Sequence, residues 1–310
     1  MRLATTIGDF ADFTVTPAEA VAAFEGTGFV HLDYDFYNVI RPGSSFLTDA
    51  WWEEVDAAAN TAARLGFDFV QAHSPNYNPL DPRTDHEAGL LATRRSIEAC
   101  GRLGIRNLVI HPGYCDTLTY PVSREAYFQA TRHFAESLLP TLEAFNVTAC
   151  FENSAEANMG NRYFFMTGRE IADFCDMVGH PLVQGCFDVG HANLRPVSLY
   201  SELVDLGSHL HALHIQDNDG LGDTHIAPLF GTMDVDAIMQ ALLRIGYNGY
   251  FTMEATSMLW PPEWPRPHRY APEVRERRVM PPSLALKRQA EGLLFNIGKF
   301  ILEQYNCFDD

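Results

Sequence analysis

The sequence predicts an α/β fold in which eight parallel strands, linked by helical segments, close into a barrel. Short runs rich in β-branched and aromatic residues recur eight times along the chain, with longer amphipathic stretches between them, as in repeated β/α units. The chain has 310 residues, enough for eight such units, and no linker divides it. We therefore expect a single TIM-barrel domain over residues 1–310.

The predicted strands are short apolar or alternating runs bounded by turn residues. They are residues 3–8, 28–33, 67–73, 106–111, 147–153, 183–189, 210–216 and 249–254. Helical periodicity is found in residues 16–26, 49–66, 86–104, 124–145, 168–179, 234–246 and 284–305. Thr16 is a suitable N-cap with Pro17 in the first turn, and Gly66 is a suitable helix end.

Charge and composition argue against several classes of protein. The chain has 22 basic and 40 acidic residues, a net charge of −18, which disfavours nucleic acid as a partner. It has no apolar run near the ~20 residues that a membrane helix needs, and its start lacks the layout of a signal peptide. Cys150 and Cys186 lie inside predicted strands, as buried free thiols of a reducing compartment would. We expect a cytoplasmic protein.

Six successive predicted strands end in a side chain that can bind a metal ion or a proton. His73 and His111 end the third and fourth strands. In the later strands, the alternation of side chains turns one such residue to the inner face each time: Glu152, Asp188, His214 and Glu254. Because TIM barrels carry their chemistry where the strands end, we expect all six to meet at one mouth of the barrel.

Three carboxylates and one imidazole, from Glu152, Asp188, His214 and Glu254, form a mainly oxygen ligand set. Such a set suits Mn²⁺, Mg²⁺ or Co²⁺, and Zn²⁺ as well. Without a cation the three carboxylates would repel one another. A metal site therefore explains both the residue types and their positions.

The stretch LHIQDNDGLGDTH, residues 213–225, raises a further question about the loop after the seventh strand. An extended backbone would place Asp223 and His225 on one face, where they could clasp an ion or a substrate. Asp217 and Asp219 either join them or only shape the loop. His31 and Asp33, at the end of the second predicted strand, are candidates for substrate contact.

Several motifs together resemble those of the xylose isomerase-like TIM barrels, which include sugar epimerases, sugar-phosphate isomerases and endonuclease IV. They are HPGY at 111–114, FENSAE at 151–156, DVGHANL at 188–194, LHIQDNDG at 213–220 and DTHIAPLFGTMDVDAI at 223–238. In the last of these, Leu229 stands where the family usually has glycine. The resemblance also implies a homo-oligomer.

The epimerase branch of this family implies one divalent cation, with Mn²⁺ favoured, on Glu152, Asp188, His214 and Glu254. It implies that Glu152 and Glu254 are also the catalytic acid and base, and that His191 contacts the substrate. The implied reaction is the isomerisation or epimerisation of a sugar, sugar phosphate or related polyol, by proton transfer through a metal-stabilised enediolate.

The endonuclease IV branch implies up to three zinc ions and phosphodiester hydrolysis. Its nine ligands find counterparts at His73, His111, Glu152, Asp188, His191, His214, Asp223, His225 and Glu254. The loops at 74–89 and 113–123 are neutral or acidic, however, whereas that branch implies basic DNA-contacting loops. We therefore prefer a small carbohydrate substrate with one to three ions. A non-catalytic sugar-binding barrel is the third alternative.

Residues 259–282 do not fit a bare β/α unit. They are rich in proline, and residues 266–278 contain five arginines. This proline- and arginine-rich C-terminal extension is either a solvated arm or a lid or subunit-interface arm, whose arginines could meet a phosphate or an acidic surface.

Overall fold

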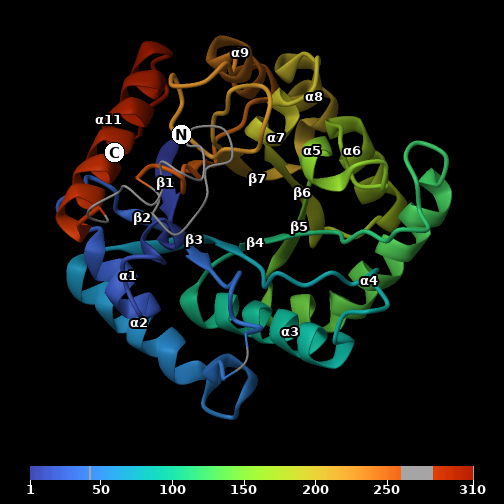
Figure 1. Cartoon of the computed structure of the whole chain (residues 1–310), viewed down its shortest axis with the longest axis horizontal. Helices are drawn as coiled ribbons and strands as arrows, with labels where there is room; N and C mark the ends of the chain where they lie inside the picture. Colours follow the sequence, from blue (N-terminus) through green and yellow to red (C-terminus); the bar gives the residue numbers. More distant parts are fainter. Residues whose placement is uncertain (42, 260–281, 310) are drawn as a thin grey trace, which may run out of the picture.

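The protein is described by a computed structural model that covers residues 1–41, 43–259 and 282–309. Eight parallel strands pair in sequence order and close into a barrel, which confirms the predicted TIM-barrel fold (Figure 1). The strands are β1 (Arg2–Thr6), β2 (His31–Asp35), β3 (Asp68–His73), β4 (Asn107–Ile110), β5 (Thr148–Glu152), β6 (Val183–Asp188), β7 (Leu210–Ile215) and β8 (Tyr250–Met253). The predicted arm lies outside the described residues, apart from its ends at 259 and 282.

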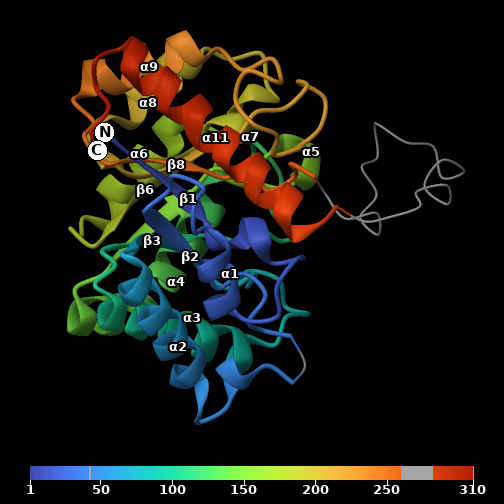
Figure 2. The ribbon, with the colours of Figure 1, turned by 90° about the vertical axis from the view of Figure 1, so that its left-hand side faces the viewer.

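Helices surround the barrel, as the views along and across it show (Figures 1 and 2). They are α1 (Pro17–Ala23), α2 (Trp51–Leu65), α3 (His86–Leu103), α4 (Arg124–Phe145), α5 (Glu156–Met159), α6 (Gly168–Val178), α7 (Val189–Asn193), α8 (Leu199–Leu206), α9 (Val235–Ile245) and α11 (Leu284–Gln304). Three 3₁₀ turns, η1 (Ile7–Phe10), η2 (Ser45–Leu47) and η3 (Gly207–His209), complete the described elements. No helix among the described residues is long and apolar enough to cross a membrane.

Helix ends follow from local sequence. The Thr16 hydroxyl accepts a hydrogen bond from the backbone N–H of Glu19, whose carboxylate returns to the backbone of Thr16, a capping box that starts α1. Thr167 and Glu170 form the same box at α6. Gly66 ends α2 in a left-handed conformation with φ 76°, which a residue with a Cβ adopts at a cost. The predicted start of α1 at Thr16 and the predicted end of α2 at Gly66 are thus confirmed.

Successive side chains along each strand pack alternately outward against the helices and inward into the barrel. Side chains such as Phe151, Phe187 and Phe251 are buried in the large core that includes the helices. A separate cluster inside the barrel consists of small side chains: Val109, Cys150, Cys186 and Ala212. Cys150 and Cys186 are buried and free, as predicted. The next inward side chains along these strands form the floor of the mouth.

Two parts of the sequence prediction were wrong in detail. Strand β2 spans residues 31–35 rather than 28–33, so His31 begins the strand, at the end away from the mouth. There the centroid of its ring lies 5.2 Å from that of the Tyr250 ring. Asp33 lies in mid-strand and the strand ends at Asp35. The structure also adds α7 and α8 between β6 and β7, where no helix was predicted, because both are too short to show a clear periodicity.

Candidate metal-binding active site

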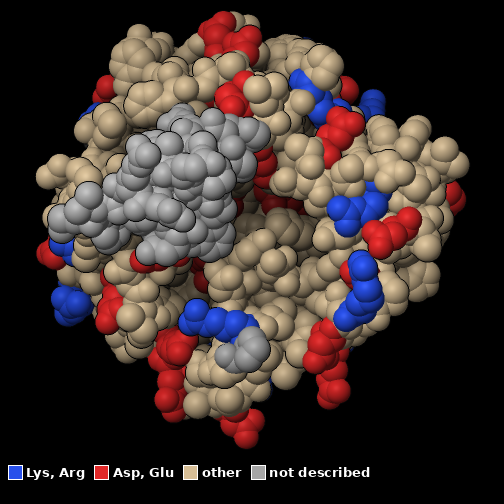
Figure 3. All heavy atoms as spheres, viewed as in Figure 1, with Lys and Arg blue, Asp and Glu red and all other residues tan. Residues whose placement is uncertain are grey.

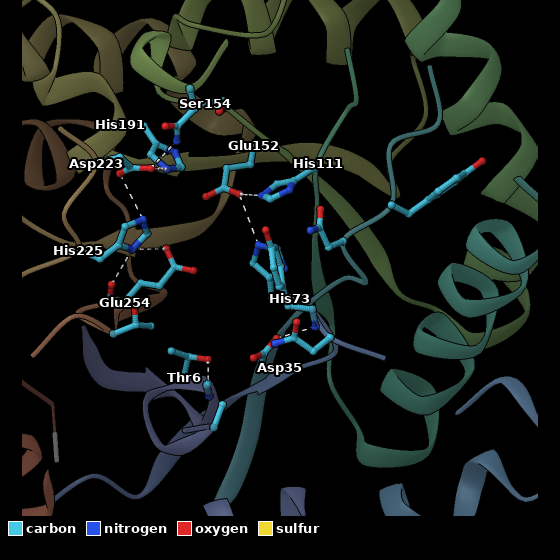
Figure 4. Close-up of a pocket in the computed structure, with 18 of the residues that line it drawn as sticks. Thr6, Asp35, His73, His111, Glu152, Ser154, His191, Asp223, His225 and Glu254 are labelled. Atoms are coloured by element: carbon cyan, nitrogen blue, oxygen red, sulfur yellow. Dashed lines mark hydrogen bonds and ion pairs between the residues drawn. The ribbon is translucent and has the colours of Figure 1, made fainter. Parts of the chain in front are cut away.

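A cavity of about 540 Å³ opens at the end of the barrel where the strands finish. Its lining includes His73 at the end of β3, His111 directly after β4 and Glu152 at the end of β5. Glu254 follows β8, where its backbone N–H still donates to the Ile215 carbonyl at 2.9 Å and so extends the strand ladder. Figure 4 shows these side chains pointing toward one another from separate strands. In Figure 3, acidic side chains lie inside the central hollow.

The deepest group, here called the inner tetrad, consists of Glu152, Asp188, His214 and Glu254. One ligand atom from each lies within 4.8 Å of all the others. His214 Nδ1 lies 2.7 Å from Glu152 Oε1 and 3.4 Å from Glu254 Oε2. Asp188 Oδ2 is buried without a hydrogen bond, an expensive state for a carboxylate oxygen that a bound cation would relieve. The donor set and this oxygen both fit a divalent cation.

A second group, the bridging triad, shares Glu152 with the inner tetrad and adds His73 and His111. Glu152 Oε2 lies 3.1 Å from His111 Nε2 and 3.8 Å from His73 Nε2. The two oxygens of Glu152 therefore face two different groups, one toward His214 and the other toward this histidine pair. A carboxylate in that position could bridge two cations.

The third group, the loop triad, consists of His191 from α7 and Asp223 and His225 from the loop between β7 and α9. Asp223 Oδ2 lies 3.4 Å from His191 Nε2, and Asp223 Oδ1 lies 3.2 Å from His225 Nε2. His225 has a positive φ of 44°, uncommon outside glycine, which turns its ring toward the cavity (Figure 4).

Backbone carbonyls fix the orientation of three histidine rings. The Nδ1 atoms of His73, His191 and His225 each lie 3.0 Å from a carbonyl oxygen, of Ser74, Asn153 and Glu254 respectively. Because a carbonyl only accepts, each Nδ1 must carry the proton. The Nε2 atoms then face the carboxylates of the site, an arrangement that commonly orients metal-binding histidines.

The electrostatics of the site demand positive charge. Burial, opposed in part by His191, raises the pKa of Asp188 to about 7. Burial disfavours the charged form of His214, but the Glu254 and Glu152 carboxylates outweigh it and raise its pKa to about 10. Burial would likewise raise the pKa of Glu152, yet His214 and the bridging histidines hold it well below its usual range. Protonated imidazoles thus supply the charge that a cation would supply.

All nine predicted residues meet in these three groups, but Asp217 and Asp219 do not join them. The carboxylate of Asp217 is fully buried and accepts hydrogen bonds from the backbone N–H groups of Asn218, Gly231 and Met233, at 2.8, 3.0 and 3.0 Å. Asp219 accepts from Leu221 at 2.9 Å. These two aspartates shape the loop that carries Asp223 and His225.

The opposite wall of the cavity contains residues that the sequence reasoning missed. Thr6, Asp9, Asp35 and Tyr37 line it, and Figure 4 shows Thr6 and Asp35 across the cavity from the loop triad. Asp35 Oδ1 accepts a hydrogen bond from the Tyr37 backbone at 2.6 Å, and burial raises the pKa of Asp35. Since Asp33 and Asp35 share a strand face, placing the strand end two residues later would have identified Asp35.

A closed parallel barrel with a polar ligand cluster at its mouth defines a TIM-barrel class of protein. Residues 19–276 match the family model described as xylose isomerase-like TIM barrel. The chain therefore belongs to the xylose isomerase-like TIM barrel family, which confirms the resemblance seen in the sequence motifs.

Individual relatives are distant. An uncharacterised protein, y4fM of Sinorhizobium fredii, is 26% identical over 246 residues, 71% of this chain and 75% of that one. Fructoselysine 3-epimerase of Escherichia coli O157:H7 is 36% identical, but over only 87 residues, 28% of this chain and 30% of the epimerase.

Two solved structures show the same fold. D-Psicose 3-epimerase in the presence of D-fructose aligns with a TM-score of 0.70 at 14% identity, over 97% of this chain and 99% of the epimerase. The IolI protein with a bound zinc atom aligns with a TM-score of 0.71 at 14% identity, over 98% and 99% of the two chains.

Proposed function

We propose that this protein is a divalent-cation-dependent isomerase or epimerase of a sugar or related polyol. The inner tetrad carries the proposal, because three carboxylates and an imidazole converge there and Asp188 Oδ2 is buried without a hydrogen bond. Glu152, Asp188, His214 and Glu254 would hold the cation, with Mn²⁺ favoured and Zn²⁺, Co²⁺ or Mg²⁺ also suited to this donor set. The epimerases among the relatives and structural neighbours support the same class.

Glu152 and Glu254 are the proposed proton carriers. A divalent cation, when bound, would polarise a carbonyl or hydroxyl of the sugar and acidify the neighbouring C–H group. Burial acts to raise the pKa of Glu254, but His214 and His225 outweigh it and lower the pKa, so both glutamates are ionised and able to accept a proton. For inversion, one glutamate would remove the proton and the other, after taking up a proton from water, would deliver it to the opposite face of the same carbon. Return of the removed proton to the adjacent carbon would instead isomerise the sugar.

The cavity lining favours an uncharged substrate. Its described residues include aspartates, asparagines and tyrosines but neither lysine nor arginine. Hydroxyl groups can donate to such carboxylates, whereas none of the described lining residues offers the guanidinium or ammonium group that commonly pairs with a phosphate. His191 and the Asp35 side of the cavity would orient the sugar hydroxyls. We therefore propose an unphosphorylated sugar as the substrate.

A second candidate function is metal-dependent hydrolysis of phosphoesters. The observation in its favour is that all nine candidate ligands gather in three adjoining groups, two of which share Glu152. Such a set could hold two or three zinc ions, which stabilise the attacking and leaving oxygens of phosphate esters. The acidic lining of the cavity argues against this function.

Replacing Glu254 by Gln tests the epimerase proposal. Gln keeps the shape and an oxygen donor but cannot accept the proton, so we expect at least a ~100-fold loss of activity. The measurement is NMR detection of solvent deuterium entering unphosphorylated ketoses, with enzyme loaded with Mn²⁺. Glu156→Gln, at an exposed position in α5, is the matched control and should exchange normally.

Wild-type exchange rates in Glu254→Gln would contradict the assigned role of Glu254. Elemental analysis of protein purified without chelators separates the two candidate functions. About one ion per chain together with deuterium exchange supports the epimerase. Two or three zinc ions, with hydrolysis of a phosphodiester and no exchange into any sugar, would replace it with the hydrolase.

A further inference from the structure

Gln216 occupies an unusual position between two of the candidate metal groups. It follows β7 directly, and its side chain is fully buried. Its amide nitrogen lies 3.2 Å from Asp188 Oδ1 and 3.1 Å from Asp223 Oδ1. Asp188 belongs to the inner tetrad and Asp223 to the loop triad. One nitrogen atom with two hydrogens thus donates to a carboxylate of each group.

We propose that Gln216 is a positioning residue that couples the inner tetrad to the loop triad, so that cation binding at one group strengthens binding at the other. The inference rests on the proposed metal dependence. The orientation of the amide follows from chemistry, because the reverse orientation would place its carbonyl oxygen against two carboxylates. With both N–H groups engaged, neither carboxylate can turn without breaking a hydrogen bond.

The close packing of Gly190 and the environment of the carbonyl oxygen both bear on the position of the Gln216 amide. A Cβ on Gly190, in α7, would lie 2.2 Å from Gln216 Cδ, so only glycine leaves room for the amide against the helix. The other end of the amide, Oε1, is buried without a hydrogen bond. A buried carbonyl oxygen without a hydrogen bond is energetically costly. The Gln216 side chain therefore keeps its hydrogen bonds to Asp188 and Asp223 although its own carbonyl oxygen has no partner.

Asp188 shows how the coupling would act. Its Oδ1 accepts from Gln216 and also from the His191 backbone N–H at 2.7 Å, which leaves Oδ2 as its free oxygen. On the other side, Asp223 Oδ1 receives the second amide hydrogen and also faces His225. A cation that fixes one carboxylate fixes the shared amide, and the amide then holds the other carboxylate in place. By linkage, this effect is equal in both directions.

Titration of metal-free protein with Co²⁺ tests the coupling. Calorimetry gives stoichiometry and affinity, and the visible absorption of Co²⁺ reports its coordination, so neither readout depends on turnover. Gln216→Met keeps the bulk but removes both hydrogen bonds. We expect a 10–100-fold loss of affinity at both groups, as for other residues that orient ligands, and a changed Co²⁺ spectrum.

Gln71→Met is the matched control. Gln71 is a buried barrel glutamine whose amide donates to Asp33 at 2.8 Å, a carboxylate outside all three groups. It should lose comparable stability yet keep wild-type Co²⁺ affinity. Gln216→Asn, whose shorter side chain cannot reach both aspartates, decides the question if Gln216→Met does not fold.

The outcomes are distinguishable. Wild-type Co²⁺ affinity in the folded Gln216 variants, or a loss at one group alone, would overturn the coupling while leaving the proposed function standing. If wild-type protein itself binds no divalent cation, the proposed function fails as well. A loss at both groups in the Gln216 variants but not in Gln71→Met supports the inference.

Discussion

Position 190 requires glycine because a larger residue would clash with a neighbouring side chain, not because of its backbone conformation. It lies within helix α7, with no positive φ, and a methyl group there would overlap the Gln216 amide at 2.2–2.3 Å from three of its atoms. Because helix and strand both are packed in the core, the amide would have to leave its position between Asp188 and Asp223.

Gly190→Ala should therefore reproduce the effect of removing the Gln216 side-chain contacts. We expect overpacking to reduce the free energy of unfolding by about 1–3 kcal/mol and Co²⁺ affinity to fall at both groups. Calorimetric titration and urea unfolding measure the two effects. Gly292→Ala, whose Cβ would meet nothing closer than 3.7 Å, is the control. Unchanged Co²⁺ affinity in Gly190→Ala would show that the amide tolerates displacement.

Residue type explains which parts of the site could be predicted. The convergence of Glu152, Asp188, His214 and Glu254 could be predicted because side chains able to bind a metal recur at strand ends with the correct parity. Gln216 gave no such signal, since an amide is neither a common metal ligand nor titratable. Asp217 looks like a ligand in the sequence, but only the structure shows three backbone N–H groups around its carboxylate.

Helix α11 is fixed to the barrel by a buried charged cluster. Lys287 and Glu291, both fully buried on α11, pair at 2.6 Å, and Asp9 of η1 lies in the same environment. Burial and repulsion from Asp9, opposed by Lys287, raise the pKa of Glu291 to about 8. Two carboxyl groups thus share one ammonium group, so protonation of one of them is favoured.

This cluster should make stability depend on pH. The folded-state pKa of Glu291 exceeds its ordinary value of 4.5, so its contribution is present at low pH and is lost as pH rises toward 8. Glu291→Gln stays neutral, so we expect its unfolding free energy to fall less than that of the wild type between pH 5 and 8. The difference should be at least about 1.4 kcal/mol, the free energy of a tenfold change in proton affinity. Urea unfolding at several pH values measures this.

Glu303→Gln, at an exposed position on the same helix, should retain the wild-type pH profile. Parallel profiles for wild type and Glu291→Gln would show that Glu291 is ionised throughout this range.

At the scale of elements, strand alternation and helix caps were sufficient to predict most of the barrel. Strand β2 was misplaced because its inward residues, Asp33 and Asp35, are aspartates, a residue type that is depleted in strands. Leu229 has a φ of 73°, so the loop keeps a glycine-like conformation where the sequence has lost the glycine. The Asp217 carboxylate accepts a hydrogen bond from the backbone of Gly231, two residues after Leu229.

The charge of the whole molecule bears on its partners. The net charge of −18 is accompanied by acidic side chains inside the mouth, visible in Figure 3. Any long polyanion would have to approach against this field, and phosphate contacts supply much of the affinity of proteins for DNA.

We therefore expect binding to duplex DNA to be weaker than a Kd of about 10⁻⁴ M at physiological salt. Fluorescence anisotropy of labelled duplexes, with and without an abasic site, measures it. The zinc-loaded protein should be included, because bound ions reduce the negative charge of the mouth. Salt-dependent binding in the micromolar range would favour the hydrolase over the epimerase.

The cluster of small side chains inside the barrel, Val109, Cys150, Cys186 and Ala212, affects which metal ions the protein could bind. Cys186 belongs to that cluster, and its sulfur lies within 4.8 Å of ligand atoms of Glu152 and His214. A hard ion such as Mg²⁺ or Mn²⁺ has little use for sulfur, whereas cadmium and mercury prefer it. The buried sulfur of Cys186 would offer these soft ions an additional ligand beside the inner tetrad. We therefore expect cadmium or mercury to bind the candidate metal site from the side of the barrel interior.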